Sequence, residues 1–271
     1  MLKRKLGIKA GMLAVDEDFL TTTGTTLFLH MPAGYAYTLS PNAPPWPVAS
    51  TAIQIRYDLT EQWTLRLGGF DADGDNVDEF DGNPHGFQFT LQPDNALLIA
   101  ETTWKGSLGG AKGFYRLGTW YDTNTFPTAS GSLKRGLTSV YLAAEQQLYS
   151  KANREEDGLY LFTLAGLILQ DERTPYDYDI HAGAYWKGLI SHWDDNLGFI
   201  VTYPHVGDVL VASNLPGQTQ TESFLELTHQ KNVLDGWAIQ GSVIHVINPG
   251  GASARQIDNA TVLGIRTTFS L

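Results

Sequence analysis

The sequence predicts an all-β fold, an antiparallel transmembrane β-barrel with about twelve strands in this chain. Strand-length segments recur along its 271 residues, and apolar and polar residues alternate within them. Long helical patterns are missing: the best apolar run, residues 159–169, is too short for a membrane-spanning helix, which needs about 20 residues. Any crossing of a bilayer must therefore be made by strands.

Clusters of Gly, Asn, Asp and Pro separate the predicted strands, as these residues do where a chain turns. The strands are expected at 5–15, 50–58, 62–71, 95–105, 113–122, 137–149, 159–170, 179–188, 196–204, 220–231, 236–247 and 260–271. Alternation is clear at 50–58, where Ile53 and Ile55 oppose Arg56. Such a strand has one apolar face and one polar face.

Two architectures produce this alternation. A soluble sandwich buries the apolar face, whereas a membrane barrel turns it toward lipid and turns the polar face toward a lumen. The predicted strands exceed the soluble average of about 5–6 residues and reach the roughly 9–11 residues that span a bilayer. Aromatic residues near strand ends suit the girdles of a barrel. They are Trp63, Trp104, Tyr121, Tyr149, Trp186, Tyr203, Trp237 and Phe269.

Charge and composition exclude several classes of function. The net charge is -11, and no cluster of basic residues beyond residues 3–5 suits nucleic acid. Cysteine is absent, so disulfides and thiolate metal sites are ruled out. The seven histidines are scattered, and neither a G-x-S-x-G nor an H-E-x-x-H motif occurs. We therefore expect no enzyme activity, no cofactor and no nucleic-acid partner.

The beginning of the chain does not read as a secretory signal. Residues 1–5 are basic, but strand-like alternation follows at once, without an apolar stretch or a small-residue cleavage site. We expect the chain to begin inside a longer protein.

Four blocks of sequence carry a resemblance to a known family. They are residues 113–122, reading GFYRLGTWYD; residues 181–188 with 194–198; residues 222–226 with 237–240 and 248–251; and residues 259–266. In this order and spacing they resemble the carbohydrate-selective porins of the OprB type. The resemblance covers most of residues 95–271. The sequence departs from the family at Ser242 and Ile244, where family members often have Asp and Gln.

The resemblance implies a location and a function. It implies a barrel domain over residues 1–271 in the bacterial outer membrane, in contact with lipid, that lets carbohydrates and small polar solutes diffuse passively. Family barrels have about sixteen strands, so the strands not found here are expected before Met1. A homotrimer is a further expectation. The alternative is a soluble or surface-exposed β-sandwich that binds carbohydrate.

The polar faces of the strands supply the candidate pore-lining residues. Turning each polar face inward places bases, acids and aromatic rings toward the lumen, where they can exchange hydrogen bonds with a passing sugar. The candidates are Lys9, Arg56, Arg66, Glu101, Arg116, Trp120, Glu145, Glu226 and Arg266, with Tyr141 as a second aromatic surface. The alternative is that these charges only keep a lumen wet, or cover the exposed face of a soluble sheet.

Two long connections stand out. Residues 16–49 are too long for an ordinary turn, and the resemblance implies that they fold into the barrel and narrow it. Tyr35, Tyr37 and Trp46 would then offer stacking surfaces, and the alternative is a surface loop.

The second long connection is an acidic loop that begins at residue 71. Its acids at the first, third and fifth positions, Asp71, Asp73 and Asp75, resemble a calcium loop. Asn76 and Gly82 replace the Gly and Glu that such a loop requires, which favours a solvated acidic loop without metal.

Overall fold

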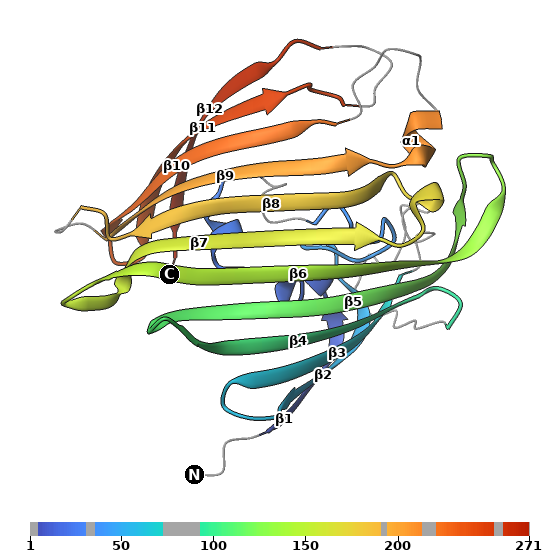
Figure 1. The fold of residues 1–271 in the computed structure, drawn as a ribbon, viewed down its shortest axis with the longest axis horizontal. Coiled ribbons are helices and arrows are strands. Elements are labelled where there is room, and N and C mark those ends of the chain that lie inside the picture. The colour runs from blue at the N-terminus through green and yellow to red at the C-terminus, as the bar shows by residue number, and fades with distance from the viewer. Residues whose placement is uncertain are drawn as a thin grey trace.

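The computed structural model describes residues 5–30, 36–72, 93–190, 194–212, 221–251 and 257–270, and within them twelve strands form one antiparallel sheet in sequence order (Figure 1). The strands are β1 Leu6–Leu13, β2 Ser50–Asp58, β3 Trp63–Asp71, β4 Ala96–Leu108, β5 Ala111–Pro127, β6 Leu133–Lys151, β7 Arg154–Ile168, β8 Tyr176–Lys187, β9 Asp195–Val206, β10 Ser223–Leu234, β11 Trp237–Ile247 and β12 Ala260–Phe269. Each coincides with a predicted strand, so the all-β fold is confirmed.

Every strand pairs with the next one along the chain, and the sheet curves around an interior (Figure 1). Short connections join β4 to β5, β6 to β7 and β10 to β11 at one end of the sheet. Helices are short: the 3-10 turns η1 Val15–Glu17, η2 Gly24–Leu27 and η5 Asp171–Arg173, and the helix α1 Asp208–Ala212. None of the helices in the described ranges has the length and apolar character to cross a membrane.

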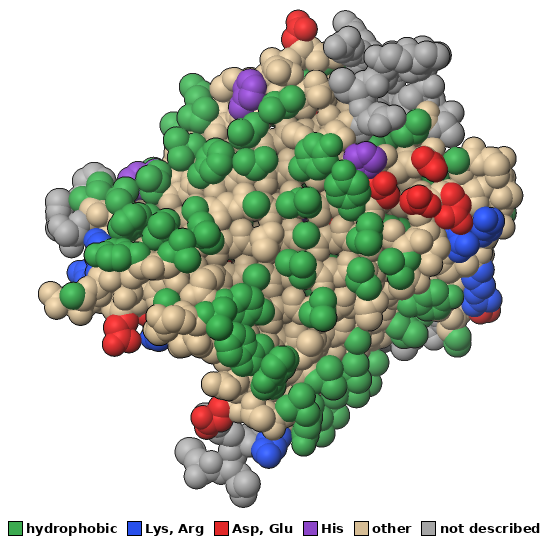
Figure 2. Space-filling model, in the orientation of Figure 1, with side chains coloured by type: hydrophobic (Ala, Val, Ile, Leu, Met, Phe, Trp, Pro, Cys, Tyr) green, Lys and Arg blue, Asp and Glu red, His purple; other side chains and the backbone are tan. Residues whose placement is uncertain are grey.

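The two faces of the sheet have opposite polarity. Leu98, Leu117 and Leu227 alternate onto the outer face and are at least half exposed. Figure 2 shows hydrophobic side chains spread over the middle of this face, with charged side chains gathered near its margins. The inner face carries Glu101 and Glu226, both buried. The expected β-sandwich alternative is wrong, because the strands described form one sheet whose apolar face is the exposed one.

Aromatic rings pack against one another at both ends of the outer face. At the end with the short connections, Trp104 lies between Trp63, at 6.5 Å, and Tyr115, at 5.4 Å between ring centroids. At the opposite end, Tyr178 lies 6.2 Å from Tyr203. Two belts of aromatic side chains bounding an apolar band are the arrangement that positions a barrel at the two surfaces of a bilayer.

Residues 14–30 and 36–48, here called the inner segment, pack on the inner face. Phe19 and Leu20 join one apolar cluster with sheet residues that include Phe70 and Leu97. A second cluster joins Phe28 to sheet residues. Glycines on the inner face of the sheet leave room for these contacts, because they carry no side chain. A Cβ on Gly166 would lie 1.9 Å from Thr38 Oγ1, and one on Gly198 would lie 2.6 Å from Leu27 Cδ2.

The assignment of faces predicts the effect of a charge on either side of β10. We expect Leu227→Arg to lower the free energy of unfolding by about 2–4 kcal/mol, because an arginine on the lipid face of a barrel strand must be desolvated. The matched variant Gln230→Arg, on the inner face of the same strand, should change it little. Urea titration of the protein folded in lipid vesicles measures both. Equal losses of unfolding free energy in the two variants would contradict the assignment of Leu227 to the lipid face and Gln230 to the inner face.

Candidate functional site

The candidate site is the inner face of the sheet together with the inner segment. All nine predicted lining residues share this face in the strand register: Lys9 on β1, Arg56 on β2, Arg66 on β3, Glu101 on β4, Arg116 and Trp120 on β5, Glu145 on β6, Glu226 on β10 and Arg266 on β12. Neighbouring strands place several of them side by side. Arg66 is directly opposite both Arg56 and Glu101.

Glu101 is the centre of a buried charge cluster. Its side chain is 0% exposed, and its Oε1 lies 3.4 Å from Arg66 Nη1 and 3.1 Å from Arg116 Nη1. Tyr141 donates its hydroxyl to the other carboxylate oxygen at 3.0 Å. Arg116 also donates to the carbonyl of Asp18 at 2.9 Å, which connects the cluster to the inner segment. Two guanidinium groups and one carboxylate leave an excess of positive charge here.

Two further bases lie beside this cluster and are more exposed. Lys9 Nζ is 2.5 Å from Asp18 Oδ2, and Arg56 pairs with Asp58 at 3.0 Å; both basic side chains are more than half exposed. Lys9, Arg56 and Arg66 line a hollow of about 270 Å³. Its donors are therefore accessible to a polar solute.

Five buried carboxylates on five strands hold the inner segment, and we call them the carboxylate clasp. Each accepts hydrogen bonds from backbone N–H or hydroxyl groups of the segment. The pairs are Glu101 with Leu20 N, Asp122 with Ser40 Oγ, Glu145 with Gly24 N, Asp179 with Tyr37 N and Thr38 Oγ1, and Glu226 with Leu29 N and His30 N. Hydrogen bonds to ionised acceptors are the stronger kind, and buried N–H groups require an acceptor.

Glu226 makes the fullest set of these contacts. It accepts Leu29 N at 2.8 Å and His30 N at 2.9 Å, one on each carboxylate oxygen. Ser242, one of the two departures from the family pattern, donates its hydroxyl to Glu226 at 2.6 Å. Two residues before Ser242 on β11, Gln240 donates its side-chain amide N–H to the Leu27 carbonyl at 2.7 Å. The segment is thus held by both its N–H and its C=O groups.

His30 lies at the end of the first described part of the inner segment. Its ring centroid is 4.0 Å from that of Phe224. Burial lowers the pKa of His30, while the nearby carboxylates of Glu226 and Glu222 act in the opposite direction. Because the lowering prevails, the imidazole is neutral at neutral pH and adds no charge to this part of the lumen.

The predicted aromatic surfaces differ in their surroundings. Trp120 and Tyr141 are buried in the apolar cluster beneath the inner segment. Tyr37 packs on Tyr176, with 5.0 Å between ring centroids, whereas Trp46 is exposed. Tyr35 lies outside the described residues.

The acidic loop is described only at its beginning. Asp71 is buried at the end of β3, and Asp73 and Asp75 lie outside the described residues. Among the residues that the structure covers, no three metal-ligating side chains come together.

Sequence reasoning missed two members of the clasp, Asp122 and Asp179. Asp122 closes the block that carries the family resemblance, and Asp179 begins a predicted strand on the same face as His181. His181 Nε2 lies 3.2 Å from Asp179 Oδ2, and both side chains are fully buried. Alternation could have placed both acids on the inner face, but their partners lie far away in sequence.

A sheet with an apolar, exposed outer face, two aromatic belts and a polar inner face that holds a folded segment is the architecture of an outer-membrane β-barrel porin. The match to known families agrees with this class: residues 2–271 match the OprB family of carbohydrate-selective porins, and the chain belongs to that family. The family places it in the bacterial outer membrane, as predicted, and among channels rather than enzymes.

Individual relatives are longer than this chain. It is 26% identical over 257 residues to Porin B of Pseudomonas aeruginosa and 24% identical over 244 residues to the putative porin QuiX of Acinetobacter baylyi. These matches cover 82% and 81% of the chain but 55% of each relative.

Solved structures show the same fold. The high-pH structure of Pseudomonas putida OprB matches with a TM-score of 0.82 and 21% identity, covering 98% of this chain and 69% of that one. The outer-membrane channel DcaP of Acinetobacter baumannii matches with a TM-score of 0.58 and 8% identity, covering 98% and 72%.

Proposed function

We propose that the protein is a porin for the passive diffusion of carbohydrates and small polar solutes across the outer membrane. The observation that carries this proposal is the inner face at the Arg66–Glu101–Arg116 cluster, where fixed donors and acceptors lie beside accessible bases. Such groups replace the water around a hydroxylated solute without binding it tightly, which is what permeation requires. No covalent step and no cofactor is involved.

The lining that we propose has two parts. Lys9, Arg56 and Arg266 present donors to the solute directly, since their side chains are accessible. Glu101, Glu145 and Glu226 act through the inner segment, which they hold in place. We expect the segment to narrow the lumen of a single barrel domain, and its packing on the inner face supports this.

The test is single-channel conductance of the protein in planar lipid bilayers, with glucose or maltotriose added. We expect stable current steps that become smaller in the presence of sugar, because a sugar in the lumen displaces ions. Stable steps that sugars leave unchanged would contradict a carbohydrate channel. A monodisperse protein in detergent-free buffer that forms no steps would contradict a porin altogether.

We also infer a homotrimer in the membrane. The exposed apolar outer face supports it, because this face offers area for contacts between subunits as well as for lipid. Native mass spectrometry in detergent measures the assembly. Three times the mass of one chain is expected, and a monomer alone would contradict the inference.

A further inference from the structure

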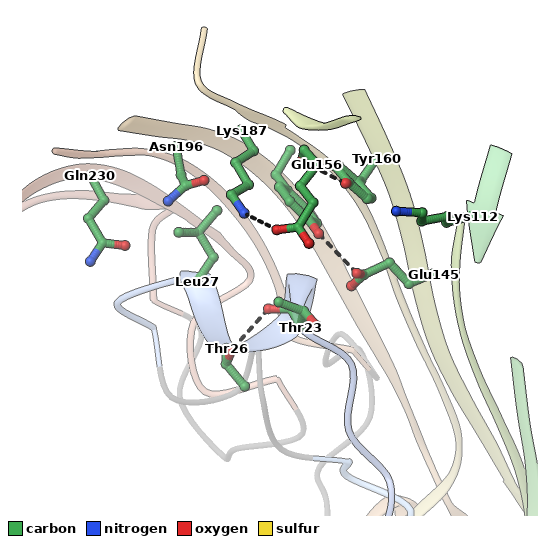
Figure 3. A pocket seen from close by; sticks show the side chains of 11 residues that line it. Thr23, Thr26, Leu27, Lys112, Glu145, Glu156, Tyr160, Lys187, Asn196 and Gln230 are labelled. Carbon is green, nitrogen blue, oxygen red and sulfur yellow. Dashed lines mark hydrogen bonds and ion pairs between the residues drawn. The ribbon is translucent and has the colours of Figure 1, made fainter. Parts of the chain in front are cut away.

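A second hollow lies away from the charge cluster, at the end of the sheet with the short connections. It has a volume of about 430 Å³, and strands β5 to β10 together with η2 surround it (Figure 3). Small-molecule pockets commonly measure about 300–1,000 Å³. We propose that this hollow, called the mouth site, is a binding subsite for an uncharged pyranose ring. The proposal rests on the proposed function.

The lysines that line the mouth site are paired with carboxylates, and its carboxylate Glu145 accepts hydrogen bonds from neutral groups. Lys112 Nζ lies 3.4 Å from Glu155 Oε2. Lys187 Nζ lies 3.4 Å from Glu156 Oε2. Glu145 accepts Gly24 N at 2.8 Å and the Tyr185 hydroxyl at 2.9 Å. A charged solute would have to displace these partners, whereas an uncharged one would not. The site therefore favours a neutral ligand.

Two amides provide the hydrogen-bonding groups. Asn196 and Gln230 are directly opposite each other on β9 and β10, half-buried, and line the hollow (Figure 3). Neither side chain has a hydrogen-bond partner among the described residues. An amide both donates and accepts, as a sugar hydroxyl does. Neighbouring strands are about 4.8 Å apart, so adjacent amides can contact adjacent hydroxyls of one ring.

An aromatic surface completes the site. The rings of Tyr160 and Tyr185 are stacked 4.8 Å apart with 1° between their planes. Tyr160 O–H donates to the Glu156 carbonyl at 2.7 Å, which fixes the ring. The faces of aromatic rings are negative, and the C–H groups of a pyranose carry partial positive charge, so the two surfaces are complementary.

The hollow continues toward the charge cluster. Tyr160 also borders an adjoining hollow of about 440 Å³ that is lined by Phe114. The Arg116 guanidinium lies 5.5 Å above the ring of Phe114, and Arg116 belongs to the cluster with Glu101. The two adjoining hollows share Lys112, Glu145 and Tyr160, so together they offer space for more than one ring of a short oligosaccharide.

The test measures the affinity of maltotriose for the detergent-solubilised protein by saturation-transfer NMR. Tyr160→Leu removes the aromatic face but keeps bulk, and Asn196→Leu removes an amide that no described residue uses. Each should weaken binding about ten-fold, which corresponds to about 1.4 kcal/mol. Tyr149→Leu, on the outer face near the same end, is the matched control and should bind as the unmodified protein does. Heat-modifiable electrophoretic mobility checks that each variant folds.

The outcomes separate this inference from the proposed function. Unchanged affinity in both folded variants would overturn the mouth site and leave the porin proposal intact. An unmodified protein that neither binds maltotriose nor lets it pass in a vesicle flux assay would overturn both. Weaker binding by both variants, with normal binding by the Tyr149→Leu control, supports the mouth site. Because the amide of Asn196 bonds to no residue that the structure describes, its variant still decides the question if Tyr160→Leu does not fold.

Discussion

Glu226→Leu is expected to release the inner segment and raise the single-channel conductance several-fold. The substitution removes the acceptor of two backbone N–H groups, those of Leu29 and His30, and of the Ser242 hydroxyl. Leaving buried donors without a partner costs about 1–3 kcal/mol for each group. A loss of this size, repeated at adjacent residues, favours a conformation in which the segment leaves the inner face for water. The lumen would then be wider.

The release of the inner segment can also be measured by chemical labelling, independently of the single-channel current. The chain has no cysteine, so Ala36→Cys introduces a single thiol at a buried position of the inner segment. We expect maleimide to label this thiol slowly when Glu226 is present and at least ten times faster in Glu226→Leu, since ten-fold corresponds to about 1.4 kcal/mol of opening free energy. Conductance recorded on the same proteins should rise in parallel with the labelling rate.

Glu155→Leu is the matched control, because it removes an exposed carboxylate whose ion-pair partner among the described residues is Lys112, at 3.4 Å. An exposed pair of this kind contributes little. Its conductance and labelling should equal those of the unmodified protein. If Glu226→Leu changes neither quantity, the carboxylate does not hold the segment, and the role that we assign to the clasp is wrong.

The strands were predictable from sequence because a barrel strand carries its own signal. Residues 50–58 were predicted as a strand with the bounds that the structure gives β2, since alternation there is uninterrupted and Pro47 precedes it. The hairpin of β5 and β6 extends further than predicted, through Pro127 and Leu133. A bulge after Asp122 breaks the alternation there, so the pattern appeared to end.

The site was predictable only in part, for a physical reason. Alternation tells which face a side chain is on, and it placed Glu101, Glu145 and Glu226 on the inner face. It does not tell what covers that face. Gly24 and Glu145 are 121 residues apart, and no local pattern links them. Trp120 was expected to offer a stacking surface, whereas the structure buries it in the apolar cluster with the inner segment. In the sequence, an inner-face position that the inner segment covers has the same alternation pattern as one that stays open to the lumen.

Arg116→Met is the second change for which we expect a large effect. Within the described part of the chain, Glu101 would keep one basic partner, Arg66, and the Asp18 carbonyl would lose its Arg116 donor. Removing the sole partner of a buried charge costs about 3–5 kcal/mol, and because Glu101 keeps Arg66 at 3.4 Å we expect a loss of free energy of unfolding below that range. Urea titration in vesicles should show this loss. The lost positive charge should also shift the reversal potential in a salt gradient toward cation selectivity.

A double-mutant cycle of Arg116→Met with Glu101→Gln measures the coupling free energy between the two side chains, separately from the contribution of each. If Arg116 acts mainly through Glu101, the two losses should not add: Arg116→Met should cost less free energy of unfolding in a Glu101→Gln background than in the unmodified protein. Arg135→Met, at a pair with Asp94 in which both side chains are exposed, controls for the loss of any arginine and should cost little. Purely additive losses would mean that the two side chains do not couple. Retained coupling with unchanged reversal potential would mean that the cluster supports the inner segment but does not face the ions. Because stability and selectivity are read from the same variant, the two roles of Arg116 can be separated.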